Sequence, residues 1–64
     1  MTLYEEKHEV GTIVVTPFIY GVIKEVVWGP DKGWGHEQYY YLVENFRFKP
    51  HWVLESEVTE SRRA

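Results

Sequence analysis

The hydrophobic pattern of the chain is that of short β-strands separated by turns. Residues 10–16, 21–28 and 37–45 are rich in β-branched and aromatic side chains, and most of their ends are marked by glycine, proline or asparagine. This composition is typical of strands in an antiparallel meander. Residues 51–54 predict a fourth strand, and residues 58–59 predict a short fifth strand. No segment has the sustained i, i+3, i+4, i+7 apolar spacing of an amphipathic helix, so we expect an all-β domain.

Alternation along these strands places apolar side chains on both faces of the expected sheet. In the first strand Val14 and Ile13 point to different faces of the sheet, and in the third strand Tyr41 and Tyr40 point to different faces. Two partly apolar faces suit a closed or two-sided small sheet better than an open sheet with one face in water. The pattern also indicates that one set of aromatic side chains stays outside the core.

The connections between the strands differ in their chemistry. Pro17 ends the first strand, because proline has no N–H for a sheet ladder. Residues 29–36 combine glycine, proline and aspartate and predict a loop without regular structure. Residues 46–49 alternate phenylalanine with arginine or lysine before Pro50, and form either a strand edge or a loop. Residues 55–57 predict a single turn.

The strand patterns resemble those of SH3-like small barrels, in particular KOW-type domains and the polymerase-interacting domains of CarD-type regulators. The resemblance spans residues 9–59. It rests on residues 10–17 (VGTIVVTP), 21–23 (GVI) with Val26, 41–43 (YLV) and 52–58 (WVLESEV). It implies an SH3-like small barrel of about five short antiparallel strands. We expect residues 1–8 to form an N-terminal arm, residues 9–59 the barrel and residues 60–64 a C-terminal tail.

Size and charge limit the classes of function. With 64 residues the chain has room for one domain, and it contains no cysteine for disulfides or thiolate metal sites. Ten acidic and seven basic residues give a net charge of −3, which disfavours nucleic acid as a partner. No apolar run approaches the roughly 20 residues that span a bilayer, and residues 1–9 do not resemble a signal peptide. We therefore expect a cytoplasmic protein without a membrane partner.

The sequence contains no motif for catalysis or for cofactor binding. It lacks Gly-x-Ser-x-Gly, His-Glu-x-x-His, the P-loop and Gly-x-Gly-x-x-Gly. The three histidines, His8, His36 and His51, are scattered and match no metal-binding spacing. We expect neither an enzyme nor a bound cofactor or metal.

Aromatic residues provide the main hypothesis about function. The candidates for contact with a partner protein are Tyr20, Trp34, Tyr40, Phe48 and Trp52. Trp34 is the strongest of them, because tryptophan is frequent among interface hot spots and this one is flanked by glycines. In the alternative interpretation, Trp34 folds back over the barrel as a lid. The structural alternative for Trp28, Tyr41 and Trp52 is packing in the core and against neighbouring strands. The leading hypothesis is a non-catalytic protein-interaction module, and the size is similar to stand-alone accessory or regulatory barrels of phages and mobile elements.

Two other functions remain open at this point. Lys24, Lys32, Arg47 and Lys49, with neighbouring aromatics, would serve a KOW-like barrel that binds nucleic acid in transcription or translation. Charges on a strand edge also guard against aggregation, which is the structural interpretation of the same residues. A homo-oligomer that buries its exposed aromatics between copies is the third possibility.

Overall fold

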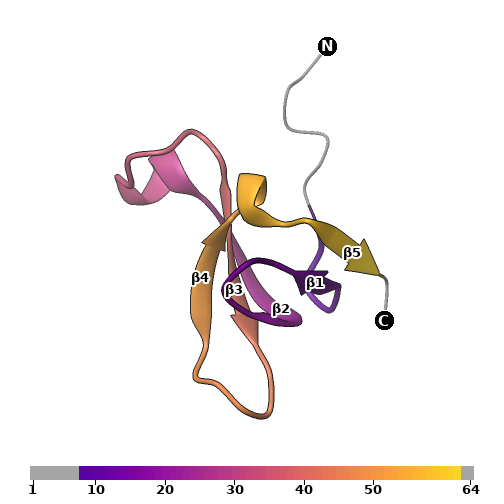
Figure 1. The fold of residues 1–64 in the computed structure, drawn as a ribbon. Coiled ribbons are helices and arrows are strands. Elements are labelled where there is room, and N and C mark those ends of the chain that lie inside the picture. The colour runs from indigo at the N-terminus through magenta and orange to yellow at the C-terminus, as the bar shows by residue number, and fades with distance from the viewer. Residues whose placement is uncertain (1–7, 63–64) are drawn as a thin grey trace.

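The structure, a computed structural model, describes residues 8–62 and contains a single sheet of five antiparallel strands. The strands are β1 (Ile13–Val15), β2 (Tyr20–Trp28), β3 (Tyr39–Glu44), β4 (His51–Leu54) and β5 (Glu60–Arg62), and two short 3-10 helices are η1 (Gly29–Lys32) and η2 (Glu55–Glu57). Their order in the sheet is β4-β3-β2-β1-β5, so β5 crosses over to pair with β1 (Figure 1). The predicted all-β fold is confirmed.

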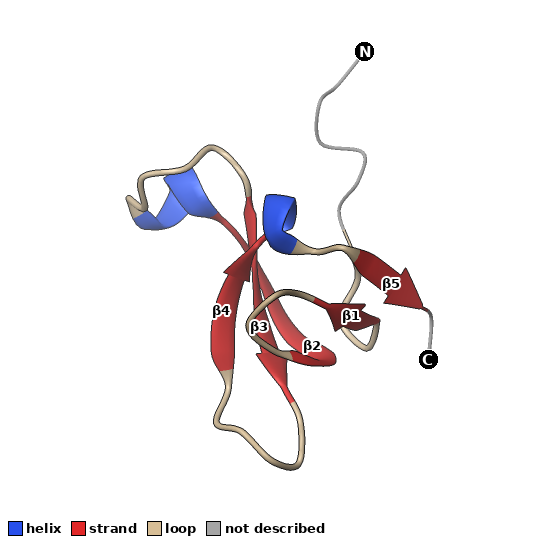
Figure 2. Cartoon of the chain, viewed as in Figure 1, coloured by secondary structure: helices blue, strands red, loops and turns tan. Residues whose placement is uncertain are grey.

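The sheet is curled, but its hydrogen-bonded ladders do not close. The long strand β2 pairs with β1 through Tyr20–Val22 and with β3 through Val22–Trp28, with a β-bulge between Ile23 and Glu25. In Figure 2, β1 and β5 run across the direction of β3 and β4. Within residues 8–62 no ladder joins β4 to β5. The SH3-like barrel therefore remains a prediction.

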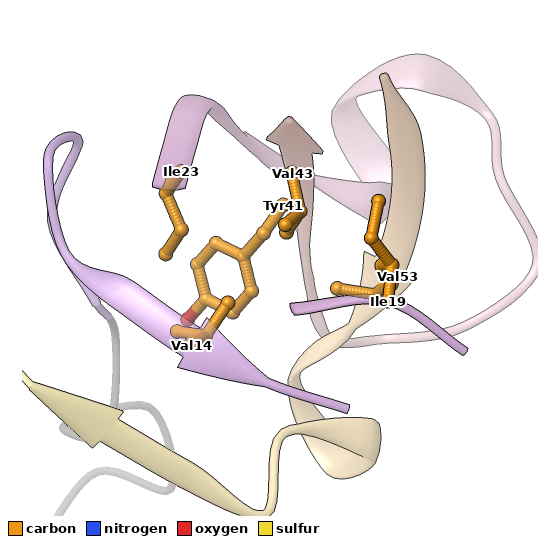
Figure 3. Close-up of a cluster of buried hydrophobic side chains, with 6 residues drawn as sticks. All are labelled: Val14, Ile19, Ile23, Tyr41, Val43 and Val53. Carbon is orange, nitrogen blue, oxygen red and sulfur yellow. The ribbon is translucent and has the colours of Figure 1, made fainter. Parts of the chain in front are cut away.

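The hydrophobic core lies on the inner side of this curled sheet. It consists of buried side chains from β1 to β4 and from the β1–β2 connection, namely Val14, Ile19, Ile23, Tyr41, Val43 and Val53 (Figure 3). Figure 3 shows the Tyr41 ring in the middle, between Ile23 and Val14. The predicted alternation is confirmed, because Val14 is 0% exposed and its neighbour Ile13 is 37% exposed. Each side chain of this size contributes about 1.5–3 kcal/mol when it is fully buried.

The last strand differs from the sequence prediction. Residues 58–59 are not a strand; Val58 instead packs against the core, and the backbone N–H and Oγ1 of Thr59 both donate to the Val15 carbonyl, at 2.8 and 3.1 Å. These bonds direct the following residues along β1. Residues 60–62, predicted as part of the C-terminal tail, form β5 instead. Of the predicted N-terminal arm, only His8 lies within the described residues.

Three of the connections between strands can be compared with their predictions. The loop predicted to have no regular structure begins with η1, where Pro30 lies in the first turn and Gly33 ends the helix at φ 75°. Residues 46–49, left open between a strand edge and a loop, are a loop. Residues 55–57 form the predicted single turn as η2.

Candidate interaction surface

The outer face of β3 and β4 carries side chains that do not reach the core. Tyr41 lies opposite Val53 and both are buried inside. Because strand side chains alternate between faces, the neighbouring positions point outward. These outward positions form two cross-strand pairs, Tyr40 with Leu54 and Leu42 with Trp52.

The connection between β2 and β3 folds back toward this outer face. The Gly29 N–H donates to the Gln38 carbonyl at 2.9 Å, and the Trp34 N–H donates to the Gly29 carbonyl at 3.0 Å. A Cβ atom on Gly29 would lie 2.6 Å from Cε1 of Tyr40, so only glycine permits this close approach. The turn thereby places the Trp34 side chain against β3 and β4.

Three aromatic rings meet at this place. Trp34 packs edge-on against Tyr40, with ring centroids 4.6 Å apart, and edge-on against Trp52, with centroids 5.1 Å apart. Such pairs contribute about 0.5–1.5 kcal/mol beyond the burial of area. We call Trp34, Tyr40 and Trp52 the aromatic cluster. Trp34 and Tyr40 are half-buried in it, and Trp52 keeps 37% of its surface exposed.

The aromatic cluster has an apolar layer beneath it. Val27 lies opposite Tyr40 and therefore on the outer face, yet it is only 9% exposed. It does not belong to the core cluster around Tyr41. The sheet thus packs side chains on both faces at this end, and Trp34 lies over the outer face. Trp52 lies on this outer face, where it pairs across the strands with Leu42 and does not belong to the core cluster.

The backbone of Trp52 lies at the outer edge of the sheet. The Leu54 N–H donates to Oε1 of Glu57 at 2.9 Å, so it points away from β3, toward the outer edge of β4. Inward and outward hydrogen-bonding groups alternate along an antiparallel strand, which places the N–H and C=O of Trp52 on that same edge. No strand within residues 8–62 pairs with this edge.

Two carboxylates, Glu25 and Glu44, share the outer face of the sheet with the aromatic cluster. Glu25 lies opposite Leu42, which in turn lies opposite Trp52, so the three share one row across the sheet. Glu44 lies two residues beyond Leu42 on the same face of β3. The β-bulge before Glu25 sets this register, and the sequence pattern had not indicated it.

Tyr20 and Phe48, the other predicted contact residues, lie elsewhere. Tyr20 is 53% exposed at the start of β2, and Phe48 is 57% exposed in the loop between β3 and β4. Figure 1 shows this loop at the opposite end of the sheet from η1. Asn45 holds both segments, because its Nδ2 donates to the Tyr20 carbonyl and its Oδ1 accepts from the Phe48 N–H at 2.9 Å.

The predicted basic residues do not form one strip. Arg47 and Lys49 lie in the loop between β3 and β4, whereas Lys32 lies in η1 at the other end of the sheet and Lys24 at the bulge of β2. All four side chains are exposed. The structure therefore brings only Arg47 and Lys49 close together in the chain and in space.

A polar group that the sequence did not indicate lies at the inner end of Tyr41. The Tyr41 hydroxyl donates to Oε1 of Glu55 and accepts from the His8 N–H at 2.9 Å. Nε2 of His8 lies 3.7 Å from Oε2 of Glu55. Burial, and next the hydrogen bond to Glu55, raise the pKa of Tyr41 far above its usual range. This tyrosine stays protonated and serves as a structural anchor.

Known signatures of function are absent from the described part of the chain. Residues 8–62 contain no group of three or more histidine or carboxylate side chains placed to hold a metal ion. None of the helices described is both long enough and apolar enough for a membrane span. No family model, no curated protein and no solved structure matches the chain. A proposal for the function therefore rests on the surface described above.

Proposed function

We propose that the protein is a non-catalytic protein-interaction module that binds an extended segment of a partner protein along β4. This proposal is based on the position of the aromatic cluster, which lies directly beside the unpaired backbone edge of Trp52. Exposed tryptophan in a well-packed setting is typical of interface hot spots. An unpaired strand edge next to a side-chain pocket is the arrangement used in β-strand addition.

The outward backbone groups of Trp52 support one mode of binding for such a segment. A residue opposite Trp52 would exchange two hydrogen bonds with its N–H and C=O groups. Its side chain would point to the outer face and contact Trp34 and Trp52. Because the three rings already hold each other in place, binding would immobilise little side-chain freedom.

Charge indicates the chemistry of the partner segment. Glu25 and Glu44 share the outer face of the sheet with the aromatic cluster, and the whole chain carries a net charge of −3. A lysine or arginine of the partner would meet both a carboxylate and aromatic rings, which favour cations. We therefore propose a partner segment that is extended and basic, and attraction over longer distance would speed its association.

The SH3-like barrel is our proposal for the finer fold. It is supported by the strand order, in which β2 is shared between a half with β1 and β5 and a half with β3 and β4. The core around Tyr41 lies between these halves and receives side chains from both. An experimental structure in which β1 did not pack against Tyr41 would contradict this proposal.

Nucleic-acid binding is a second candidate, because of the loop between β3 and β4. Phe46 is 90% exposed and Phe48 is 57% exposed in this loop, and Arg47 and Lys49 alternate with them. Stacking on exposed rings together with cationic contacts is typical of proteins that bind single strands. The acidic net charge of the chain opposes this function.

Selection from a random peptide library tests the leading proposal. The affinity of the best peptide would be measured for the natural sequence, for Trp52→Ala and for Phe46→Ala, whose exposed ring lies outside the aromatic cluster. We expect Trp52→Ala to weaken binding by about tenfold or more, as truncation of a hot spot does, and Phe46→Ala to have little effect. Selection of no peptide, or equal losses in both variants, would contradict the proposal.

A separate titration distinguishes the second candidate. Binding of a labelled single-stranded oligonucleotide would be followed by fluorescence anisotropy at several salt concentrations. Affinity that falls with salt and is abolished in the Arg47→Glu, Lys49→Glu double variant would support nucleic-acid binding. Absence of binding at low salt would exclude it.

A further inference from the structure

The second unpaired edge of the sheet belongs to β5. This strand lies last in the order β4-β3-β2-β1-β5, and within residues 8–62 no strand pairs with its outer side. Its three residues, Glu60, Ser61 and Arg62, are all exposed. A negative, a neutral and a positive side chain follow each other in this order.

The hydrogen bonds of β1 show which backbone groups of β5 point outward. The Ile23 N–H donates to the Thr12 carbonyl at 2.9 Å, and the Thr16 N–H donates to the Ile19 carbonyl at 3.0 Å. The backbones of Thr12 and Thr16 therefore face β2. Since the direction alternates along an antiparallel strand, Val14 also faces β2, and the intervening Ile13 and Val15 face β5.

The register between β1 and β5 completes this assignment. Ile13 lies opposite Arg62 and Val15 lies opposite Glu60, so the backbone groups of Glu60 and Arg62 are directed to β1. Ser61, between them, directs its N–H and C=O away from the sheet. The free edge of β5 thus offers one donor and one acceptor, both from Ser61.

We propose that a second copy of this chain pairs with the edge of β5 in antiparallel orientation, with Ser61 opposite Ser61 of the partner subunit. The two serines then exchange two backbone hydrogen bonds across a two-fold axis. The same register places Glu60 opposite Arg62 of the partner subunit, and Arg62 opposite Glu60 of the partner subunit. The sequence Glu-Ser-Arg is therefore complementary to itself in this orientation.

The two charge pairs occupy the favourable positions of such a ladder. Glu60 and Arg62 flank the hydrogen-bonded serine pair, so each lies in a non-hydrogen-bonded pair, where side chains approach most closely. Opposite charges facing each other across a ladder are stabilising, and like charges are destabilising. A β5 strand of a single sign would repel its copy, whereas this strand attracts it.

An apolar surface beside β5 would be covered at the same time. Ile13 and Val15, 37% and 38% exposed, share the outer face with Arg62 and Glu60, their cross-strand neighbours. Together with Ser61 they line a shallow pocket of about 240 Å³. In the proposed dimer the aliphatic stem of Arg62 of the partner subunit lies beside this pocket, and the two-fold axis places both pockets on one face.

This dimer is independent of the proposed function. The aromatic cluster lies over β3 and β4, and β4 is the opposite edge of the sheet from β5. Pairing through β5 therefore leaves the Trp52 edge open in each copy. A dimer would present two such edges at once.

Sedimentation of the full chain over a wide range of concentration tests the proposal. We expect a monomer–dimer equilibrium for the natural sequence. Glu60→Arg and Arg62→Glu should each weaken the dimer by at least about tenfold, because two attractive pairs become repulsive. Arg47→Glu, an equal change of charge in an exposed loop far from β5 in sequence, is the matched control and should have no effect. Circular dichroism would verify that each variant is folded.

Mixing the two variants gives the decisive result. In an equimolar mixture, Glu60→Arg presents two positive residues to the two negative residues of Arg62→Glu, so a heterodimer should form. The double variant with both changes should also dimerise, because it remains complementary to itself. The proposal is overturned if the natural protein stays monomeric at every concentration, if Arg47→Glu dissociates the dimer equally, or if the mixture stays monomeric.

Discussion

Tyr41 joins three separate parts of the structure. Its ring is fully buried in the core, and its hydroxyl donates to Glu55 of η2 and accepts from the backbone of His8. One residue of β3 thereby fixes the segment before β1 and the turn after β4. The sequence identified Tyr41 as a core residue but did not indicate its polar partners, which are 33 and 14 positions away.

Tyr41→Phe tests the role of this hydroxyl. The substitution removes one donor and one acceptor and leaves the His8 N–H and the Glu55 carboxylate without their partner. We expect the free energy of unfolding to fall by about 1–3 kcal/mol, measured by urea denaturation. Tyr20→Phe removes a hydroxyl from a side chain that is 53% exposed, and should change stability little. Equal effects of the two substitutions would contradict the anchoring role.

The pKa of Tyr41 also predicts how stability depends on pH. The pKa is raised in the folded protein by burial and by the bond to Glu55, whereas an unfolded tyrosine titrates near 10. The unfolded state therefore loses this proton first as pH rises above 10, and stability falls by up to about 1.4 kcal/mol per pH unit. The stability advantage of the natural protein over Tyr41→Phe should shrink above that pH. A constant difference between pH 9 and 11 would contradict this prediction.

Gly29 determines whether the aromatic cluster can form. A Cβ atom at this position would lie 2.4 Å from the His36 carbonyl oxygen and 2.6 Å from Cε1 of Tyr40. We expect Gly29→Ala to displace the turn and reduce the near-ultraviolet circular dichroism that arises from packed aromatic rings. Gly35→Ala is the matched control, because a Cβ there meets nothing within 4 Å. An unchanged spectrum for Gly29→Ala would show that Trp34 does not depend on this turn.

Among the elements, the loop between β3 and β4 is held in its conformation by the side chain of Asn45. Oδ1 of Asn45 accepts from the Arg47 N–H at 2.7 Å and from the Phe48 N–H at 2.9 Å, and its Nδ2 donates to the Tyr20 carbonyl. Asparagine commonly makes such local bonds at the start of turns. The loop is thereby tied to the start of β2, which keeps Phe48 close to the sheet.

Asn45→Ala should loosen this loop without unfolding the sheet. We expect faster hydrogen exchange at the Arg47 and Phe48 amides and a loss of about 1 kcal/mol of stability. Lys49→Ala, in the same loop, should leave both exchange rates unchanged. If the two amides remain equally protected in Asn45→Ala, the side chain does not order the loop.

The strands differ in how far the sequence predicts them. Apolar alternation correctly separated Val14 from Ile13 and Tyr41 from Tyr40, because the core selects one face of each strand. It failed for β5, whose three polar residues carry no such pattern. That strand exists because the Thr59 N–H and Oγ1 bind the Val15 carbonyl and because the backbone groups of β1 need partners.

The residues of the candidate surface were also predicted only in part, because the sequence does not show which side chains meet. Residue type and loop position singled out Trp34, Tyr40 and Trp52, which the structure brings together. Tyr20, from the connection at residues 17–20, and Phe48, assigned to one face with Tyr40 and Trp52, were grouped with them, and the structure places both elsewhere. Distance along the chain does not determine which rings meet; the register between β3 and β4 and the turn at Gly29 do.

At the scale of the whole molecule, the sheet has two unpaired edges of different chemistry. The β4 edge combines the Trp52 backbone with the aromatic cluster and nearby carboxylates. The β5 edge carries Glu60 and Arg62 on either side of Ser61. Open strand edges promote aggregation unless they are protected or used. We assign a partner segment to the first edge and a second copy of the chain to the second.

The tryptophans allow the most direct test of the β4 assignment. Trp34 and Trp52 belong to the aromatic cluster, whereas Trp28 lies opposite Tyr39 on the other face of the sheet, with ring centroids 5.0 Å apart. The chain contains three tryptophans, so each indole N–H gives a separate signal in a nitrogen–proton NMR spectrum. Trp28 is therefore an internal control.

The measurement is a titration of the labelled protein with the selected basic peptide. We predict the largest shifts at the indole signals of Trp34 and Trp52 and at the backbone amide of Trp52, with little change at Trp28. Shifts concentrated in residues 45–50 or in β5, or equal shifts of all three indoles, would contradict binding along β4.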